Sequence, residues 1–145
     1  MKLIIAFVVS FFLIGCDDRN REVINGDVIR VPGYVSDARD DLRSAIVANI
    51  FQTVEFKCHA LEIDNQWTIG CFKPDPRPAP FLLFSVNQKG KAESGGLGYG
   101  LVALNGKAKQ YAENSSMSLF GIDTSFNTEM NIGDAINKYV AAFPE

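Results

Sequence analysis

Two cysteines in the middle of the chain constrain its fold more than any other feature. They lie in two segments, TVEFKCHALEI and QWTIGCF, which are separated by Asp64-Asn65. If Asp64-Asn65 forms the two-residue loop of a β-hairpin, Ile63 faces Gln66 and Cys58 faces Cys71. Counted from this loop, 58–71 is a non-hydrogen-bonded pair, whose Cα atoms lie about 4.5 Å apart, within disulfide range. The sequence therefore predicts an antiparallel hairpin with a Cys58–Cys71 disulfide.

The same register places one set of side chains on a single face of the hairpin, which should meet the core: Phe56, Cys58, Ala60, Trp67, Ile69 and Cys71. The disulfide would close a loop of 12 intervening residues, which corresponds to about 3 kcal/mol in the chain-entropy description. A redox or metal site is the alternative for two cysteines. Their spacing does not fit a CxxC motif, and His59 is the only histidine.

The N-terminus has the pattern of a targeting segment. Lys2 supplies a positive charge, and the apolar run Leu3–Ile14 follows it. This run fits a signal peptide and is shorter than the about 20 residues that span a bilayer. The run leads into Gly15-Cys16, and the motif LIGC resembles the lipobox of bacterial lipoproteins. The resemblance covers about the first 18 residues. It implies that residues 1–15 are removed and that Cys16 carries a diacylglycerol and an acylated amine.

Two aspartates follow the lipobox cysteine. Asp17 and Asp18 match the positions that resemble the inner-membrane retention signal of enterobacterial lipoproteins. The chain length and the CDDR start also resemble the small YafY-type inner-membrane lipoproteins of enterobacteria. The resemblance implies an acyl (palmitate) anchor in the cell inner membrane with the protein on its periplasmic side. That compartment is oxidising and permits the disulfide, and two or more acyl chains hold a protein firmly.

Three segments make up the predicted domain organisation. A lipoprotein signal peptide (1–15) precedes the lipidated cysteine and a tether (16–35), and a single α+β periplasmic domain follows (36–145). Within the tether, Asn25-Gly26 between β-branched residues predicts a small hairpin or an edge strand. The domain should begin with a helix that Ser36 or Asp37 caps and whose apolar stripe covers a sheet.

The remaining elements complete an α+β fold. Phe81–Val86 is predicted to be a strand buried on both faces, and Asn105-Gly106 to be the loop of a further hairpin. SMSLFGI could add a strand, and Asn131 should cap a helix over 132–142 with the stripe Ile132, Ile136, Tyr139, Val140 and Phe143. We expect an antiparallel sheet of four or five strands with an N-terminal and a C-terminal helix packed on one face.

No constellation of residues specifies catalysis, and no catalytic residue, metal or cofactor is predicted. His59 should point away from the cysteines and be a surface or half-buried residue beside Glu55, Lys57 and Lys73. Glu55 and Glu62 could be arranged as a glycosidase pair, but nothing distinguishes them from solvated residues. Two further features have both a functional and a structural interpretation. Trp67 could be a recognition anchor or a packed core residue. A lipid-facing patch or a solvated face could be formed by four lysines: Lys89, Lys91, Lys107 and Lys109.

The numbers of charged residues narrow the classes of function that the chain can have. The chain has a net charge of -3; residues 1–15 contain one lysine and no acid, so the rest has 13 basic and 17 acidic residues. This balance argues against nucleic acid as a partner. We expect a non-enzymatic binding or envelope-stress-related module with a possible envelope protein partner, recognisable by an exposed apolar patch and the absence of a polar cleft. The alternatives are a small envelope inhibitor or exclusion factor that uses loop 73–80 or 88–100, and a hydrolase with a pocket that joins His59 or two carboxylates with shifted pKa values.

Overall fold

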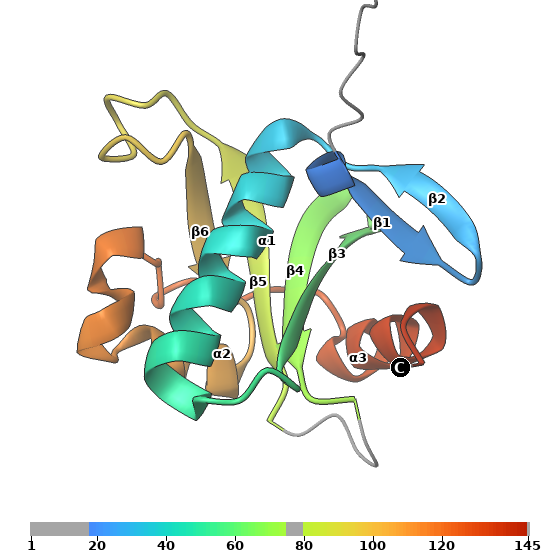
Figure 1. Ribbon diagram of the computed structural model, residues 1–145. Coiled ribbons are helices and arrows are strands. Elements are labelled where there is room, and N and C mark those ends of the chain that lie inside the picture. Colours follow the sequence, from blue (N-terminus) through green and yellow to red (C-terminus); the bar gives the residue numbers. More distant parts are fainter. Residues whose placement is uncertain (1–17, 75–79, 145) are drawn as a thin grey trace, which may run out of the picture.

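A four-stranded antiparallel sheet forms the centre of the domain, and a separate two-stranded hairpin lies beside it (Figure 1). The computed structural model describes residues 18–74 and 80–144; the expected signal peptide, Cys16, Asp17 and most of loop 73–80 lie outside these residues. The strands are β1 (Arg21–Ile24), β2 (Asp27–Arg30), β3 (Lys57–Ile63), β4 (Gln66–Phe72), β5 (Leu82–Gln88) and β6 (Tyr99–Ala103). The helices are α1 (Gly33–Ala45), α2 (Gly106–Ala112) and α3 (Ile132–Ala142). Within the described ranges, no helix combines the length and apolar character needed to cross a membrane.

The central hairpin has the predicted register. Asp64 and Asn65 form the loop between β3 and β4, both with positive φ (52° and 60°), which these residue types tolerate better than most. Cys58 and Cys71 are directly opposite each other with their Cα atoms 4.0 Å apart, and they form the predicted disulfide. Both cysteines are buried, so the bridge joins the edge strand β3 to its neighbour β4 inside the core.

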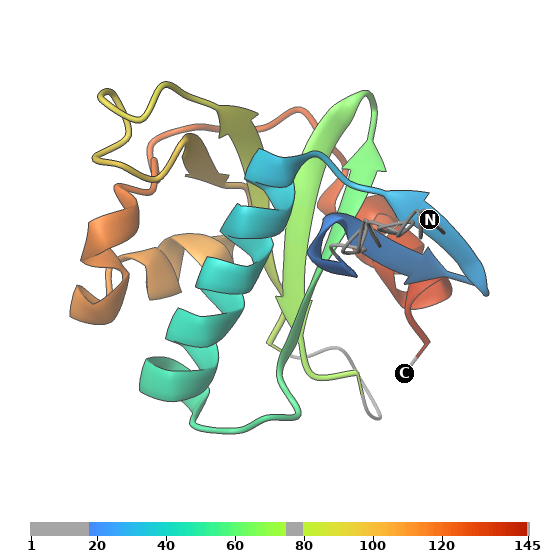
Figure 2. The same cartoon turned by 45° about the horizontal axis from the view of Figure 1, so that its top comes forward.

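The sheet is covered on both faces. Side chains of α1 pack with Cys58, Cys71 and Phe84 on one face, while α3 packs with Phe72 and Leu83 on the other. The α+β class with an antiparallel sheet is confirmed, but the N-terminal and C-terminal helices lie on opposite faces instead of one. The physical reason is β5, whose first five residues are all buried, because such a strand needs apolar partners on both sides. Figures 1 and 2 show α1 crossing its face of the sheet.

Two expected strands are helical. Asn105 caps α2 instead of turning a hairpin: its Oδ1 accepts a hydrogen bond from the Ala108 N–H at 3.1 Å. The same oxygen accepts from the Leu83 N–H at 3.1 Å, and the Asn105 Nδ2 donates to the Phe81 carbonyl at 2.7 Å. These bonds hold the start of α2 against β5 and therefore favour the helix. The segment expected as a further strand is a 3₁₀ helix over Ser115–Phe120, so the sheet has four strands in the described residues.

The folded part of the chain begins well before residue 36. The predicted hairpin at Asn25-Gly26 exists as β1 and β2, and Val31 after it is buried. Helix α1 then starts at Gly33 instead of at a cap on Ser36 or Asp37, because Pro32 supplies the carbonyl that accepts from the N–H groups of the first turn. Residues 18–35, expected as a tether, are therefore ordered structure attached to the domain.

Helix α3 has the predicted bounds and the predicted cap. The Asn131 Oδ1 accepts a hydrogen bond from the Asp134 N–H at 3.1 Å. The buried side of the helix contains Ala135, Tyr139 and Ala142, whereas Val140, assigned to the apolar stripe, is exposed. Tyr139 reaches into the sheet, where its hydroxyl is 2.7 Å from the Thr68 Oγ1.

Both edges of the four-stranded sheet have partners. On the β3 edge, the Ala60 N–H donates to the Glu22 Oε1 at 2.8 Å. On the β6 edge, the Ala103 N–H donates to the Asp123 carbonyl at 2.9 Å, and the Asp123 N–H donates to the Leu101 carbonyl at 3.0 Å. Backbone groups that would otherwise face water at these positions are thus satisfied within the chain.

Candidate functional site

The charged residues selected from the sequence do not form one site. Glu55 forms an exposed ion pair with Lys73 at 2.8 Å, and Glu62 is exposed on β3. The four lysines proposed as a patch are also separated. Lys89 and Lys91 follow the end of β5, whereas Lys107 and Lys109 follow the end of β6, which is antiparallel to it, so the two pairs lie at opposite ends of these strands.

Trp67 packs partly buried against the α1 side of the core, on the predicted face of the hairpin. This placement agrees with the packing interpretation of the residue.

His59 is partly buried and takes part in a structural network. It alternates with Cys58 along β3 and so points to the other face, as predicted. Its ring stacks on Phe143 with the centroids 4.0 Å apart, and its Nδ1 lies 3.3 Å from the Glu22 Oε2. Of the neighbours expected from the sequence, Lys57 lines the same small hollow as His59, and Glu55 and Lys73 form an ion pair with each other.

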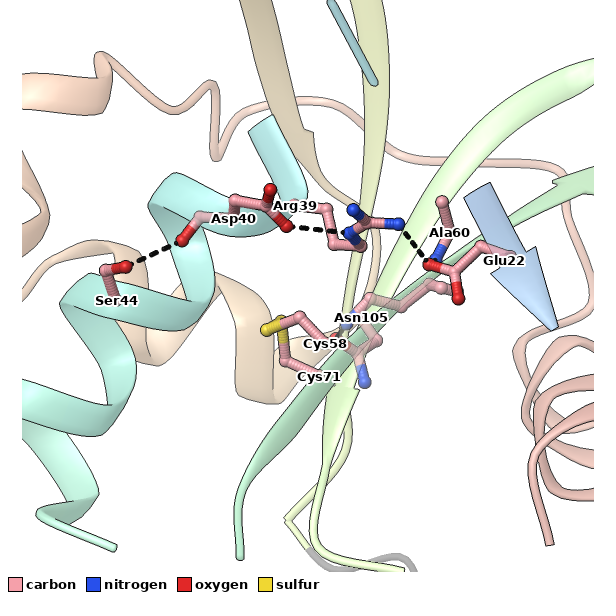
Figure 3. The surroundings of a disulfide bond; sticks show 9 residues. Glu22, Arg39, Asp40, Ser44, Cys58, Ala60, Cys71 and Asn105 are labelled. Carbon is pink, nitrogen blue, oxygen red and sulfur yellow. Dashed lines mark hydrogen bonds and ion pairs between the residues drawn. A yellow bond between two sulfur atoms is a disulfide. The ribbon is translucent and has the colours of Figure 1, made fainter. Parts of the chain in front are cut away.

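A buried ion pair attaches the β1–β2 hairpin to the domain (Figure 3). The Arg39 Nη1 donates to the Glu22 Oε1 at 2.8 Å, and the side chains of Arg39 and Glu22 are 10% and 7% exposed. Burial alone would raise the pKa of Glu22, but hydrogen bonds from His59, the Ala60 N–H and Arg39, together with the positive charge of Arg39, outweigh burial. The pKa of Glu22 is therefore below its ordinary value, and the carboxylate is charged at neutral pH.

The arginine of this pair also binds the backbone that leads into the hairpin. Its Nη1 donates to the Arg21 carbonyl at 2.9 Å and its Nη2 to the Arg19 carbonyl at 2.6 Å, while its Nε donates to the Asp40 Oδ1 at 2.9 Å. A guanidinium group with its donors used in this way fixes the position of the hairpin relative to α1.

A cleft of about 620 Å³ opens on the α3 face of the sheet. Ser85, Val102 and Leu104 line it from β5, β6 and the residue that follows β6, and the segment 126–130 lines it from the loop before α3. Ser85, which carries a hydroxyl group, is buried in the sheet, whereas Phe126 is 51% exposed. The cleft therefore combines a fixed sheet surface with an aromatic ring that is open to solvent.

The remaining lining residues are polar. Asp64, Gln66 and Asn87 contribute from the β3–β4 loop, β4 and β5, and Glu129 contributes a second carboxylate. No lysine, arginine or histidine is among the described residues that line the cleft. Carboxylates, amides and an exposed ring suit a neutral or positively charged polar ligand, and the two carboxylates disfavour an anionic one.

Sequence reasoning missed this cleft, although one signal for it was present. Along β5, Phe84 and Val86 face α1, so Ser85 and Asn87 lie on the other face. That face thus becomes polar toward the end of an otherwise apolar strand. The segment 126–130 gave no such signal, because only the folded chain places it beside β5 and β6.

Loop 88–100, considered as an inhibitory loop, projects from the sheet between β5 and β6 (Figure 1). It is closed by its own hydrogen bonds: the Gly98 N–H donates to the Ser94 Oγ at 2.7 Å, and the Gly96 N–H donates to the Lys91 carbonyl at 2.7 Å. The other candidate, loop 73–80, lies mostly outside the described residues.

No group of three or more histidine, cysteine, aspartate or glutamate residues is placed to hold a metal ion in the part of the chain that the structure describes. Comparisons with protein-family models, with curated proteins and with solved structures found no match. The function is therefore inferred from the residues of this chain.

Proposed function

We propose that this protein is a lipid-anchored, non-enzymatic binding module on the periplasmic side of the bacterial inner membrane. The cleft on the α3 face is its ligand site, and the ligand is a neutral or positively charged polar molecule of the envelope. The lipobox-like motif that ends at Cys16 supports the anchor, and Asp17 and Asp18 support retention in the inner membrane. A buried disulfide that joins β3 to β4 agrees with an oxidising compartment.

The observation that carries the binding proposal is the open cleft with polar walls, which differs from the apolar patch without a polar cleft that the sequence led us to expect of a binding module. The floor of the cleft consists of β5 and β6 side chains, which belong to the hydrogen-bonded sheet and so hold their positions without a ligand. Binding then requires little ordering of the protein, which favours affinity. The exposed Phe126 offers a flat apolar surface beside the hydrogen-bonding groups.

The anchor predicts how three forms of the protein distribute in cells. Wild type should incorporate radioactive palmitate and band with the inner membrane in a density gradient. Cys16→Ser should lose the lipid label and remain as unprocessed precursor, because the acylated thiol is gone. Replacing Asp17 and Asp18 with serine should move a labelled protein to the outer membrane. A labelled Cys16→Ser protein would exclude the anchor, and wild type banding with outer-membrane porins would exclude the retention signal.

The cleft predicts where a ligand perturbs the protein. Soluble cell-wall fragments of the amino-sugar type, which carry hydroxyl, amide and amino groups and no carboxylate, should shift the NMR signals of Ser85, Asn87 and the segment 126–130. Phe126→Ala should weaken this binding about tenfold, the loss typical of removing one central contact. Leu119→Ala is the matched control, because Leu119 is equally apolar, is 87% exposed and does not line the cleft. Equal binding by both variants would contradict the assignment of the cleft.

A hydrolase remains the second candidate because Asp64 and Glu129 line the same cleft. Two carboxylates on either side of a bond can act as general acid and as base or nucleophile. Mass spectrometry of the same cell-wall fragments after incubation distinguishes the two functions. Unchanged fragments support the binding module, whereas cleavage that is lost in both Asp64→Asn and Glu129→Gln supports the hydrolase.

A further inference from the structure

We propose that the outer face of the β1–β2 hairpin rests on the surface of the lipid bilayer. This inference depends on the lipid anchor of the proposed function and adds the orientation of the domain to it. We define the outer face of the hairpin as Arg21, Val23, Val28 and Arg30. Arg21 is paired with Arg30 and Val23 with Val28, so the four side chains lie on one face, opposite the face that carries Glu22.

The outer face of the hairpin is apolar, positively charged and open to solvent. Val23 and Val28 are 59% and 61% exposed, and every residue of β2 is exposed. Arg21 forms an ion pair with Asp18 at 3.2 Å, but this pair is at the surface and so binds weakly. Lipid phosphates can therefore compete for Arg21, and Arg30 is exposed as well. Valines that insert between headgroups and arginines that bind phosphate form the two components of an interfacial surface.

The position of Cys16, the proposed anchor, indicates that the bilayer covers the outer face of the hairpin. Cys16 precedes Asp18 by two residues, which can span about 7 Å at most. The 3₁₀ turn over Asp18–Asn20 leads directly into β1 (Figure 2). Anchoring at Cys16 thus places the hairpin at the headgroup layer without any further spacer.

The size of the surface argues against a protein partner. Each strand of the hairpin has four residues, so the outer face extends about 13 Å along the strands. A specific protein interface buries about 1,200–2,000 Å² in total, which two such strands cannot supply. A bilayer imposes no such requirement, because the acyl chains provide the affinity and the hairpin has only to orient the domain.

The hairpin can orient the domain because its inner face is fixed. The Glu22 Oε1 binds Arg39 and the Ala60 N–H, both at 2.8 Å, so the hairpin cannot rotate independently of β3. In the strand order β3-β4-β5-β6, the hairpin contacts the β3 edge, while the floor of the cleft lies on β5 and β6. With the hairpin on the membrane, the floor of the cleft lies toward the opposite side of the sheet from the bilayer.

Nitroxide labels on the full lipoprotein test this contact. The chain has three cysteines; with Cys16 acylated and Cys58 joined to Cys71, a new cysteine is the only free thiol. Val28→Cys carries the label, and Leu119→Cys is the control because Leu119 is 87% exposed and distant in sequence from the anchor. The proteins are reconstituted in vesicles of phosphatidylethanolamine and phosphatidylglycerol. The ratio of relaxation by oxygen to relaxation by a water-soluble nickel chelate is measured by electron paramagnetic resonance.

The label at position 28 should have a several-fold higher ratio than the label at position 119. Arg21→Gln together with Arg30→Gln should reduce that ratio in phosphatidylglycerol-containing vesicles. Equal ratios at the two positions in a protein that floats with the vesicles would overturn the membrane contact and leave the anchor intact. Spin–spin coupling between labels at position 28 would assign the surface to a second copy instead. A protein without acyl chains, which fails to float, would overturn the proposed anchor and this inference together.

Discussion

Glu22→Ala should lower the free energy of unfolding by about 3 kcal/mol. Removing one partner of a buried ion pair costs about 3–5 kcal/mol because the other charge stays buried. Arg39 keeps Asp40 and two backbone carbonyls as acceptors, which places the effect at the lower end of that range. The substitution also leaves the Ala60 N–H at the β3 edge without its acceptor. Urea denaturation of the mature protein measures the loss.

A matched substitution and a pH series test the cause of this effect. Glu62→Ala, at an exposed position of β3, should change stability by less than about 0.5 kcal/mol. Because the pKa of Glu22 is below its ordinary value in the folded protein, its contribution is complete at neutral pH and is lost as the pH falls through that lower pKa. The stability difference between wild type and Glu22→Gln should therefore shrink in acid. A difference that does not change between neutral pH and pH 3 would contradict a charged, buried Glu22.

Opening the Cys58–Cys71 bridge should have a similarly large effect. The bridge spans 13 positions of sequence, and chain entropy assigns about 3 kcal/mol to a loop of this size. The double variant Cys58→Ala/Cys71→Ala should therefore unfold at a clearly lower urea concentration than the oxidised wild type. The measurement is the denaturation midpoint with and without a reducing agent.

The double variant is also the control for the effect of the reducing agent on the wild type. A reducing agent should lower the midpoint of the wild type and leave that of the double variant unchanged, because the variant has no bridge to open. Both cysteines are buried, so reduction should proceed through unfolding and be slow under native conditions. Identical midpoints for the oxidised and reduced wild type would show that the bridge does not contribute to stability.

Much of the fold could be predicted where local signals agreed with each other. The loop Asp64-Asn65 fixed the hairpin register, and the cysteines provided an independent check on it. For α3, the cap at Asn131 and the apolar stripe indicated the same bounds. At Asn105-Gly106 the local signal was ambiguous, since the dipeptide suits a hairpin loop and a helix cap equally. The hydrogen bonds from Asn105 to Leu83 in β5 and to Phe81 just before it, 22 and 24 residues away, favour the helix.

The role of Glu22 and the position of the cleft could not be predicted, because both depend on contacts between residues that are far apart in the sequence. Glu22 lies in a charged stretch and resembles a solvated residue, but its partners Arg39 and His59 are 17 and 37 residues away. This is why the hairpin was assigned to a tether. The cleft likewise joins β5, β6 and the segment 126–130, and only the polar face at the end of β5 indicated it. Lipidation at Cys16 and retention through Asp17 and Asp18 remain predictions from the sequence.

The hydrogen bonds that the chain makes along the two edges of the sheet have a consequence if the protein is anchored, as proposed, in many copies on one membrane. Lipid anchoring confines proteins to two dimensions, where encounters between identical molecules are frequent. Open strand edges would then template pairing from copy to copy and lead to fibres. Here Glu22 binds the Ala60 N–H on β3, and Asp123 binds the backbone of Leu101 and Ala103 on β6. We therefore expect the protein to tolerate high surface density without polymerising through its central sheet.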